Sequence, residues 1–200
     1  LDIGLIFLFL SRYQGGMTKL KILMVGPKEA GKTMIANMLT EHDDAFSSSR
    51  QKPYKPTVAT RILECERDLA DNTRSWDTRS AEVELWDVSG DQKYEGCYPA
   101  IMDKCDGVIL VYDPQNHAHE REIELWYEWF VKNPGLSDSK CLCFAHAKDS
   151  SRSERPSVPR ALRKVNLVST DFQSASKIKE EFDNFLSDLD TGSSGGKKSR

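Results

Sequence analysis

Residues 26–33 combine glycine, lysine and threonine at a spacing that binds phosphate. They read Gly-Pro-Lys-Glu-Ala-Gly-Lys-Thr, which matches the phosphate-loop pattern G-x-x-x-x-G-K-[ST] at every fixed position. Gly26 and Gly31 allow the backbone to curl so that successive N–H groups point toward an anion. Lys32 then reaches the outer phosphates, and the Thr33 hydroxyl binds Mg²⁺. We expect the following loop residues to contact a phosphate chain: Gly26, Lys28, Glu29, Ala30, Gly31, Lys32 and Thr33.

The residues on either side of this loop supply the context that the motif requires. An apolar run at 20–25 precedes it, and apolar residues at helical spacing follow it from position 34 to 39. This strand–loop–helix order argues against the alternative, a chance Gly-Lys-Thr turn.

A second motif, D-x-x-G, lies further along the chain. Asp87-Val-Ser-Gly90 follows the apolar run 83–86, so that the aspartate ends a predicted strand. Such an aspartate can hold a Mg²⁺-bound water, and the glycine amide can contact the terminal phosphate. Thr57, earlier in the chain, stands just before the predicted strand 58–66 and is placed to give a further Mg²⁺ ligand. The alternative is an ordinary strand threonine. We expect Thr33, Thr57 and Asp87 to form a metal site, with Gly90 against the nucleotide.

Apolar runs that alternate with segments of helical periodicity indicate a doubly wound α/β fold. The predicted strands are 20–25, 58–66, 81–88, 107–112 and 141–145, and the predicted helices are 32–41, 94–103, 119–131 and 174–188. The strands at 58–66 and 81–88 are expected to pair as a hairpin. Residues 150–164 are expected to form a loop with at most a short helix at 160–164. Most aromatic side chains are expected in the core, but Trp129 lies off the apolar face of its helix and is expected to be exposed.

Composition limits the classes of function. A chain of 200 residues with 38% hydrophobic residues is expected to form one domain with a packed core. A net charge of −3 argues against nucleic acid as a partner. The five cysteines include no C-x-x-C pair, which favours reduced thiols in a cytosolic protein over disulfides or a metal site.

Both ends are expected to lie outside the folded domain. The apolar stretch 3–10 is too short to span a bilayer, which takes about 20 residues. Because Met17 directly precedes the first predicted strand, we interpret residues 1–16 as an upstream extension that need not be native. The alternative is an apolar segment that docks on the domain or on a partner. Residues 17–189 then form the domain, and 190–200 form a disordered tail whose end has no cysteine to prenylate, so no stable lipid anchor is expected.

From residue 19 to 189 the chain resembles the Ras-like small GTPases, because phosphate loop, Thr57, Trp-Asp-x-x-Gly and a late strand follow in that family's order. Strings such as Tyr-Lys-Pro-Thr, Arg-Ile-Leu-Glu and Ser-Gly-Asp-Gln-Lys-Tyr-Glu are similar to the Rab-like GTP-binding subunits of intraflagellar transport complex B. The resemblance implies a six-stranded, mostly parallel sheet with one antiparallel edge strand and helices on both faces. It also implies GTP or GDP with Mg²⁺ as ligands, and the coiled-coil subunits of complex B as partners. The implied location is the cytoplasm and the cilium or flagellum with its base.

Several positions depart from the small-GTPase pattern in ways that bear on hydrolysis. Lys28 stands where fast-hydrolysing members carry a small residue, and its side chain would crowd the space of a water-orienting group. Asp91 stands at the catalytic position, where that family usually has a glutamine to orient the attacking water. An ionised aspartate has no N–H to donate; Gln92 is a less suitable alternative, because a shift of one residue redirects the side chain. Lys55 replaces the arginine expected two residues before Thr57.

The base-recognition motif is altered as well. Asn-Lys-x-Asp is expected, and the chain has His146-Ala-Lys148-Asp149. Asp149 can accept hydrogen bonds from the guanine edge, and Lys148 can fold over the base in place of the missing alkyl stem. His146 either contacts the base or is simply a strand-end residue. Ser169 and Thr170 are candidates for a loop that touches the guanine O6.

Three functions compete on these grounds. The first is a GTP-loaded module that docks a partner, the second a cycling GTPase with a trans-acting activator, and the third a scaffold with an empty site. The intact phosphate loop argues against the third, and Lys28 with Asp91 favours the first. The residues expected to form the partner surface flank Thr57 and Gly90: Tyr54, Lys55, Tyr94 and Tyr98, the last of which could equally belong to the core.

Overall fold

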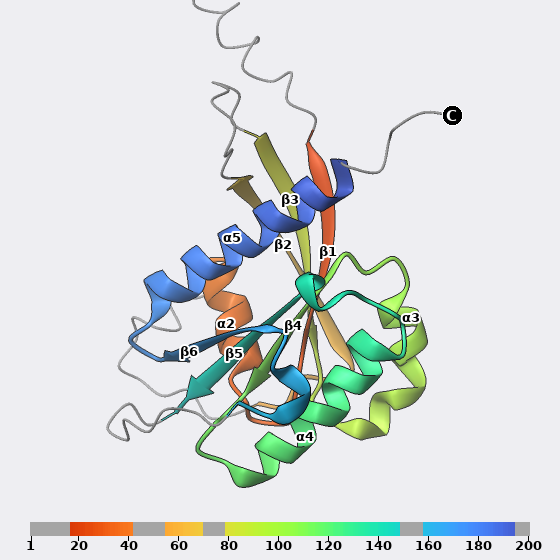
Figure 1. The fold of residues 1–200 in the computed structure, drawn as a ribbon, viewed down its shortest axis with the longest axis vertical. Coiled ribbons are helices and arrows are strands. Elements are labelled where there is room, and N and C mark those ends of the chain that lie inside the picture. The colour runs from red at the N-terminus through yellow and green to blue at the C-terminus, as the bar shows by residue number, and fades with distance from the viewer. Residues whose placement is uncertain (1–16, 42–54, 70–78, 149–157, 195–200) are drawn as a thin grey trace, which may run out of the picture.

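The protein is described by a computed structural model that covers residues 17–41, 55–69, 79–148 and 158–194. Its six-stranded sheet has the order β2-β3-β1-β4-β5-β6 (Figure 1). The strands are β1 (Thr18–Val25), β2 (Thr60–Leu69), β3 (Arg79–Val88), β4 (Gly107–Tyr112), β5 (Cys141–Ala147) and β6 (Asn166–Asp171). Only β2 and β3 pair antiparallel, and β2 is an edge strand. The expected mostly parallel sheet with one antiparallel edge strand is therefore confirmed.

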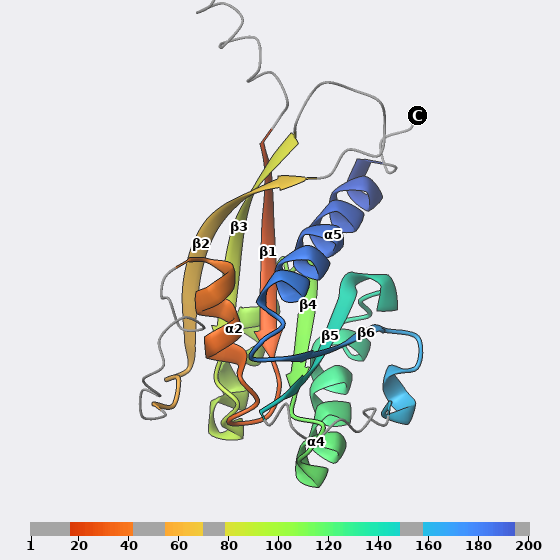
Figure 2. The ribbon, with the colours of Figure 1, turned by 90° about the vertical axis from the view of Figure 1, so that its left-hand side faces the viewer.

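Helices cover both faces of this sheet (Figures 1 and 2). α2 (Lys32–Leu39) and α5 (Ala175–Ser194) pack on one face, and α3 (Tyr98–Met102) and α4 (His117–Tyr127) pack on the other. All six residues of β4 are buried, because a central strand is covered on both sides. From Ile62 to Leu69 of β2, exposed side chains alternate with half-buried or buried ones, as expected for a strand with one open face.

An aromatic cluster joins α3 to α4. The Tyr98 ring centroid lies 4.8 Å from that of Phe130 and 5.7 Å from that of Trp126. Trp129 was expected to be exposed, but it is half-buried, because its ring lies 5.6 Å from Trp126 and 5.9 Å from Tyr98. A wide π-helical turn, Glu128–Lys132, continues α4 and buries the consecutive residues Phe130 and Val131.

All four predicted helices have different bounds in the structure; α2, predicted to residue 41, ends at Leu39. The segment 94–103 divides into a 3₁₀ helix, Gln92–Cys97, and α3, because Pro99 favours the start of a new helix. α4 begins two residues early, where the Asn116 carboxamide oxygen accepts a hydrogen bond from the Ala118 N–H at 3.0 Å. α5 continues to Ser194, into the segment predicted as a disordered tail; the remainder of that tail, and residues 1–16, lie outside the described residues.

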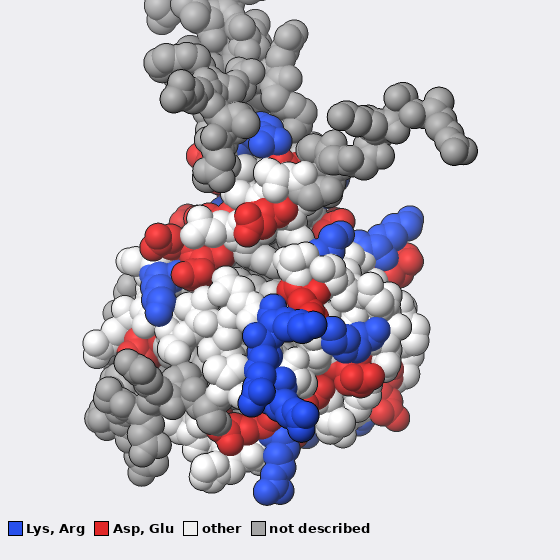
Figure 3. All heavy atoms as spheres, viewed as in Figure 1, with Lys and Arg blue, Asp and Glu red and all other residues white. Residues whose placement is uncertain are grey.

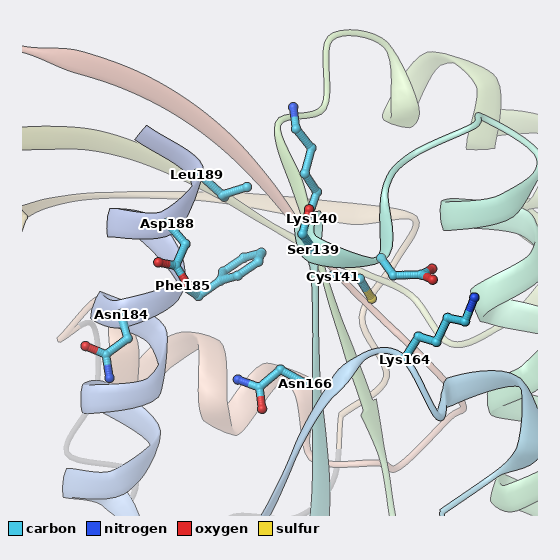
Figure 4. A pocket seen from close by; sticks show the side chains of 10 residues that line it. Ser139, Lys140, Cys141, Lys164, Asn166, Asn184, Phe185, Asp188 and Leu189 are labelled. Carbon is cyan, nitrogen blue, oxygen red and sulfur yellow. The ribbon is translucent and has the colours of Figure 1, made fainter. Parts of the chain in front are cut away.

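A hollow of about 330 Å³ opens at the amino ends of β5 and β6, beside α5 (Figure 4). Cys141 and Asn166 line it from the strands, and Phe185 and Leu189 line it from α5. Phosphate-loop residues lie at the carboxyl end of β1, so this hollow is at the opposite end of the sheet from the predicted site.

Lys and Arg side chains gather in a column on the face viewed in Figure 3, although the net charge of the chain is −3. None of the helices in the described ranges has the length and apolar character needed to cross a bilayer.

Candidate nucleotide-binding site

The phosphate loop leaves the carboxyl end of β1 and enters α2. Gly26 has a φ of 143°, and a Cβ at this position would lie 2.0 Å from the Val111 carbonyl oxygen of β4. Gly31, the N-cap of α2, has a φ of 96°, and a Cβ there would lie 2.8 Å from His146 Cδ2. Both glycines are therefore required by conformation and by space. The loop is wedged against the carboxyl ends of β4 and β5, where ligands bind in open α/β sheets.

Lys32 is buried beneath this loop. Its Nζ donates hydrogen bonds to the Gly26 carbonyl at 2.8 Å and to the Pro27 carbonyl at 2.6 Å. Burial lowers the pKa of the ammonium to about 8, although the negative charges of Asp87 and Glu122 act in the opposite direction. The arrangement presents a desolvated cation to the centre of the loop, where a phosphate chain would be held most strongly.

The three predicted metal-binding residues lie together. Thr33 Oγ1 is 2.9 Å from Thr57 Oγ1 and donates to Asp87 Oδ2 at 2.8 Å. Asp87 is fully buried, and its Oδ1 has no hydrogen-bond partner among the described residues. Two hydroxyls and a carboxylate are the hard oxygen ligands that Mg²⁺ prefers, so the donor set fits this ion. Thr33 and Thr57 would hold it, and Asp87 would orient its water; a bound Mg²⁺ would neutralise phosphate charge.

Gly90 brings the D-x-x-G segment against the phosphate loop. A Cβ at this position would lie 2.4 Å from the Lys28 backbone nitrogen and 2.5 Å from the Pro27 carbonyl carbon. The preceding Ser89 N–H donates to the Ala59 carbonyl oxygen at 2.8 Å, which joins this segment to the residues after Thr57. The segments that contain Thr57 and Gly90 therefore meet at the phosphate loop.

Asp91 and Lys28, the two unusual positions, form an ion pair. Lys28 Nζ lies 3.1 Å from Asp91 Oδ2, and Lys93 Nζ lies 3.2 Å from the same oxygen. Lys28, together with the Lys93 backbone and side chain, holds the pKa of the Asp91 carboxyl below its usual value. Asp91 is therefore charged and held by two lysines, and its side chain has no donor for a water molecule.

Of the residues predicted for base recognition, His146 and Thr170 contact each other, whereas Lys148 lies across the phosphate loop near Glu29. His146 is fully buried; its Nδ1 lies 3.1 Å from Thr170 Oγ1, and its ring packs edge-on against Phe172. Burial lowers the pKa of this imidazole to about 4, so it is neutral. Lys148 is exposed, with its Nζ 3.9 Å from Glu29 Oε2 across the phosphate loop.

Ser169 and Thr170 were predicted in a loop, but they lie in β6, because they pair with Ala145 and His146 in the parallel ladder. The Ser169 side chain is exposed, and Thr170 is buried. Asp149, the predicted guanine acceptor, lies outside the described residues, as does Tyr54.

Arg61 was missed by the sequence analysis. Its Nε lies 3.3 Å from Asp87 Oδ2, and its Nη2 donates to the Asn37 carboxamide oxygen of α2 at 2.8 Å. The alternation of β2 could have placed Arg61 on the same side as Leu63, toward α2, but the cross-strand partner could not be read from local sequence.

The sheet order, the phosphate loop after β1 and the Thr57 and Asp87–Gly90 segments beside it define a Ras-like P-loop GTPase domain. In agreement, residues 21–149 match the protein-family model described as Ras of Complex, Roc, domain of DAPkinase.

Comparison with known proteins narrows this class. Intraflagellar transport protein 22 homolog of Danio rerio is 38% identical over 173 residues, 85% of this chain and 89% of the relative. The Homo sapiens homolog is 38% identical over 177 residues, 86% and 91% of the two chains. The GTP-bound crystal structure of T. brucei IFT22/74/81 matches with a TM-score of 0.65 and 26% identity, over 90% of this chain and 99% of that chain. The chain therefore belongs to the intraflagellar transport protein 22 family of Ras-like GTPase domains.

Proposed function

We propose that this chain is a GTP-binding subunit of the intraflagellar transport machinery, and that it docks coiled-coil partners through its switch segments, residues 55–59 and 89–97. The observation that carries the proposal is the cluster of Thr33, Thr57 and Asp87 beside the buried Lys32. Such a cluster provides the donors that a nucleoside triphosphate and its divalent cation require. The T. brucei neighbours are GTP-bound IFT22 structures, and one of them is an IFT22/74/81 assembly. The proposed location is the cytoplasm and the cilium or flagellum with its base, and the proposed domain is 17–189.

Exposed apolar side chains support a partner surface at the switch segments. Val58 is 72% exposed and Ile62, near the start of β2, is 51% exposed. Tyr94 is half-buried and lies within the second switch segment, so it remains available as an aromatic anchor. Tyr98 is only 5% exposed and packs into the α3–α4 cluster, so it belongs to the core and not to the proposed surface.

The resident nucleotide is the most direct test of this function. The purified protein would be denatured and its released nucleotide identified by chromatography. GTP supports the docking module. GDP supports the second candidate, a cycling GTPase with a trans-acting activator, which the same set of Lys32, Thr33, Thr57 and Asp87 would equally serve. No bound nucleotide, together with no uptake of added GTP or GDP, contradicts both.

Intrinsic hydrolysis is expected to be slower than the roughly 10⁻⁴ s⁻¹ of unassisted small GTPases. The reason is the Lys28–Asp91 ion pair, which fills the space of a water-orienting glutamine with a charged group that lacks a donor. The double substitution Lys28→Gly/Asp91→Gln should raise the single-turnover rate at least about tenfold, which corresponds to about 1.4 kcal/mol of barrier. Lys93→Ala, which removes only the outer lysine from Asp91, is the control and should leave the rate near wild type. A wild-type rate equal to that of the double variant would count against this assignment.

Docking is expected to weaken when either switch segment is altered. Tyr94→Ala removes the proposed anchor, and Thr57→Ala removes the hydroxyl held by Thr33, so each should weaken capture of the coiled-coil partner in the presence of GTP by roughly five- to thirtyfold. Leu125→Ala is the matched control, because Leu125 is 48% exposed but lies on α4, outside the switch segments. Lys148→Ala should weaken nucleotide binding more than it weakens capture of the partner. Full partner capture by both switch variants would place the interface on another face.

A further inference from the structure

Arg61 and Asp87 face each other across the β2–β3 ladder. They are directly paired residues in the antiparallel register, and the Arg61 Nε lies 3.3 Å from Asp87 Oδ2. The other end of the guanidinium donates to Asn37 Oδ1 of α2 at 2.8 Å. The Arg61 side chain is 40% exposed, whereas that of Asp87 is 0% exposed. One partly hydrated cation therefore connects β2, β3 and α2 at a fully buried carboxylate.

A buried carboxylate needs positive charge or donors near it, because transfer of an ion out of water is costly. Three donors converge on Asp87 Oδ2: the hydroxyls of Thr33 and Thr57, at 2.8 and 3.4 Å, and the Arg61 guanidinium. Oδ1 has none within the described parts of the chain. The hydroxyl donors are neutral, so Arg61 supplies the charge that directly contacts this carboxylate.

We propose that Arg61 is a positioning residue that competes with the divalent cation for Asp87. The inference rests on the proposed nucleotide function, since the cation accompanies the nucleotide. A cation held by the Thr33 and Thr57 hydroxyls acts on the same carboxylate as the guanidinium, and two positive charges at one carboxylate repel each other. Arg61 therefore weakens Mg²⁺ binding, and it balances the Asp87 charge whenever Mg²⁺ leaves. Asn37 of α2 accepts a hydrogen bond from the same guanidinium. Competition between Arg61 and Mg²⁺ for Asp87 therefore also links metal binding to the contact between α2 and β2.

A purely structural tie between β2 and α2 is the competing explanation, and Arg67 provides the control for it. Arg67 lies on the same side of β2, donates to the Leu39 carbonyl of α2 and pairs with Asp183 at 3.6 Å. It makes no contact with Asp87. Arg67→Gln thus removes a guanidinium contact between β2 and α2 of the same kind but leaves the residues of the metal site unchanged.

The test measures release of a fluorescent GDP from the full chain at fixed ionic strength, as free Mg²⁺ is varied. Arg61→Gln should lower the Mg²⁺ concentration that gives half-maximal retention by about tenfold, a coupling typical of neighbouring charges. Arg61→Lys, which keeps the charge, should stay within about threefold of wild type. Arg67→Gln should leave the half-maximal concentration unchanged. An unchanged or higher Mg²⁺ requirement in Arg61→Gln overturns the proposal.

Thermal unfolding gives a second readout that does not depend on nucleotide release. In EDTA, Arg61→Gln should melt at a lower temperature than Arg67→Gln, and Mg²⁺ with GDP should raise its melting temperature by more than that of wild type. If Arg61→Gln does not fold in EDTA, recovery of a folded protein on adding Mg²⁺ and GDP supports competition. No recovery, while Arg67→Gln folds, overturns it. A wild-type chain that binds no GDP contradicts the proposed function itself.

Discussion

Replacing Lys32 with alanine is expected to weaken guanine-nucleotide binding at least about a hundredfold. Hydrogen bonds to charged groups contribute about 1.5–3 kcal/mol each, and the ammonium would make more than one to a phosphate chain. No other lysine or arginine is buried in the parts of the chain that the structure describes, so no neighbour can take its place. Titration with a fluorescent GDP measures the effect, with the exposed Lys177 as the alanine control. Retention of nucleotide by Lys32→Ala would refute the site assignment.

The lowered pKa of Lys32 adds a dependence on pH with a definite sign. Its value of about 8 in the folded protein lies below the ordinary 10.5, so the unfolded chain binds more protons between these two pH values. This group therefore adds stability as the pH rises through that window. Nucleotide binding runs in the opposite direction, because phosphate needs the protonated ammonium. The dissociation constant of GDP should be flat from about pH 6.5 to 7.5 and should approach a tenfold rise per pH unit above 8. A flat profile up to pH 9 would contradict the lowered pKa of Lys32.

Alanine at Gly26 is expected to be the most destabilising of four matched glycine substitutions. Gly26 has both a positive φ and a carbonyl 2.0 Å from the added Cβ, that of Val111. Gly90 has only the close approach to the phosphate loop, and Gly135 has only a positive φ of 73° with open space around it. Gly96 has neither. The series therefore separates backbone strain from steric exclusion.

The expected changes in the free energy of unfolding follow that order. Gly26→Ala should cost more than about 4 kcal/mol, an exceptional value for one substitution. Gly135→Ala should cost about 1–2 kcal/mol from the left-handed backbone alone. Gly96→Ala should be neutral or stabilise by about 0.4–1 kcal/mol. Urea denaturation measures all four, and Gly90→Ala should fall between Gly26→Ala and Gly135→Ala. Equal stability of the Gly26 and Gly96 variants would contradict the packing of the phosphate loop against β4.

The sheet was predictable where strands carry a continuous apolar run. β4 and the buried part of β5 are such runs, and the structure confirms both. β6 was not assigned from the pattern, since only Val168 and Thr170 are buried in it and the strand is polar elsewhere. The π-helical turn after α4 was also missed, because a helix with one widened turn has nearly the same apolar spacing as an ordinary helix.

The predicted site depended on motif spacing, and the structure brings most of its residues together. Their roles toward nucleotide and metal stay predictions. The position of the Arg61 guanidinium depends instead on strand register, which pairs residues 26 positions apart. Lys28 and Asp91 were each recognised as unusual, but their ion pair depends on how Gly90 approaches the loop. That approach is a tertiary contact with no local signal.

Ala59 is the fixed point nearest to Thr57, which lies two residues before it. From Thr60 onward the strand is fixed in the ladder with β3, and the Ala59 carbonyl accepts the Ser89 N–H at 2.8 Å. Ala59 itself has a φ of 53°, a backbone value that few side chains adopt without constraint. Thr57 lies two residues before this fixed point, and two extended residues reach about 7 Å. The Thr57 Cα therefore stays within about 7 Å of Ala59, so a docked partner can meet this threonine only inside that radius.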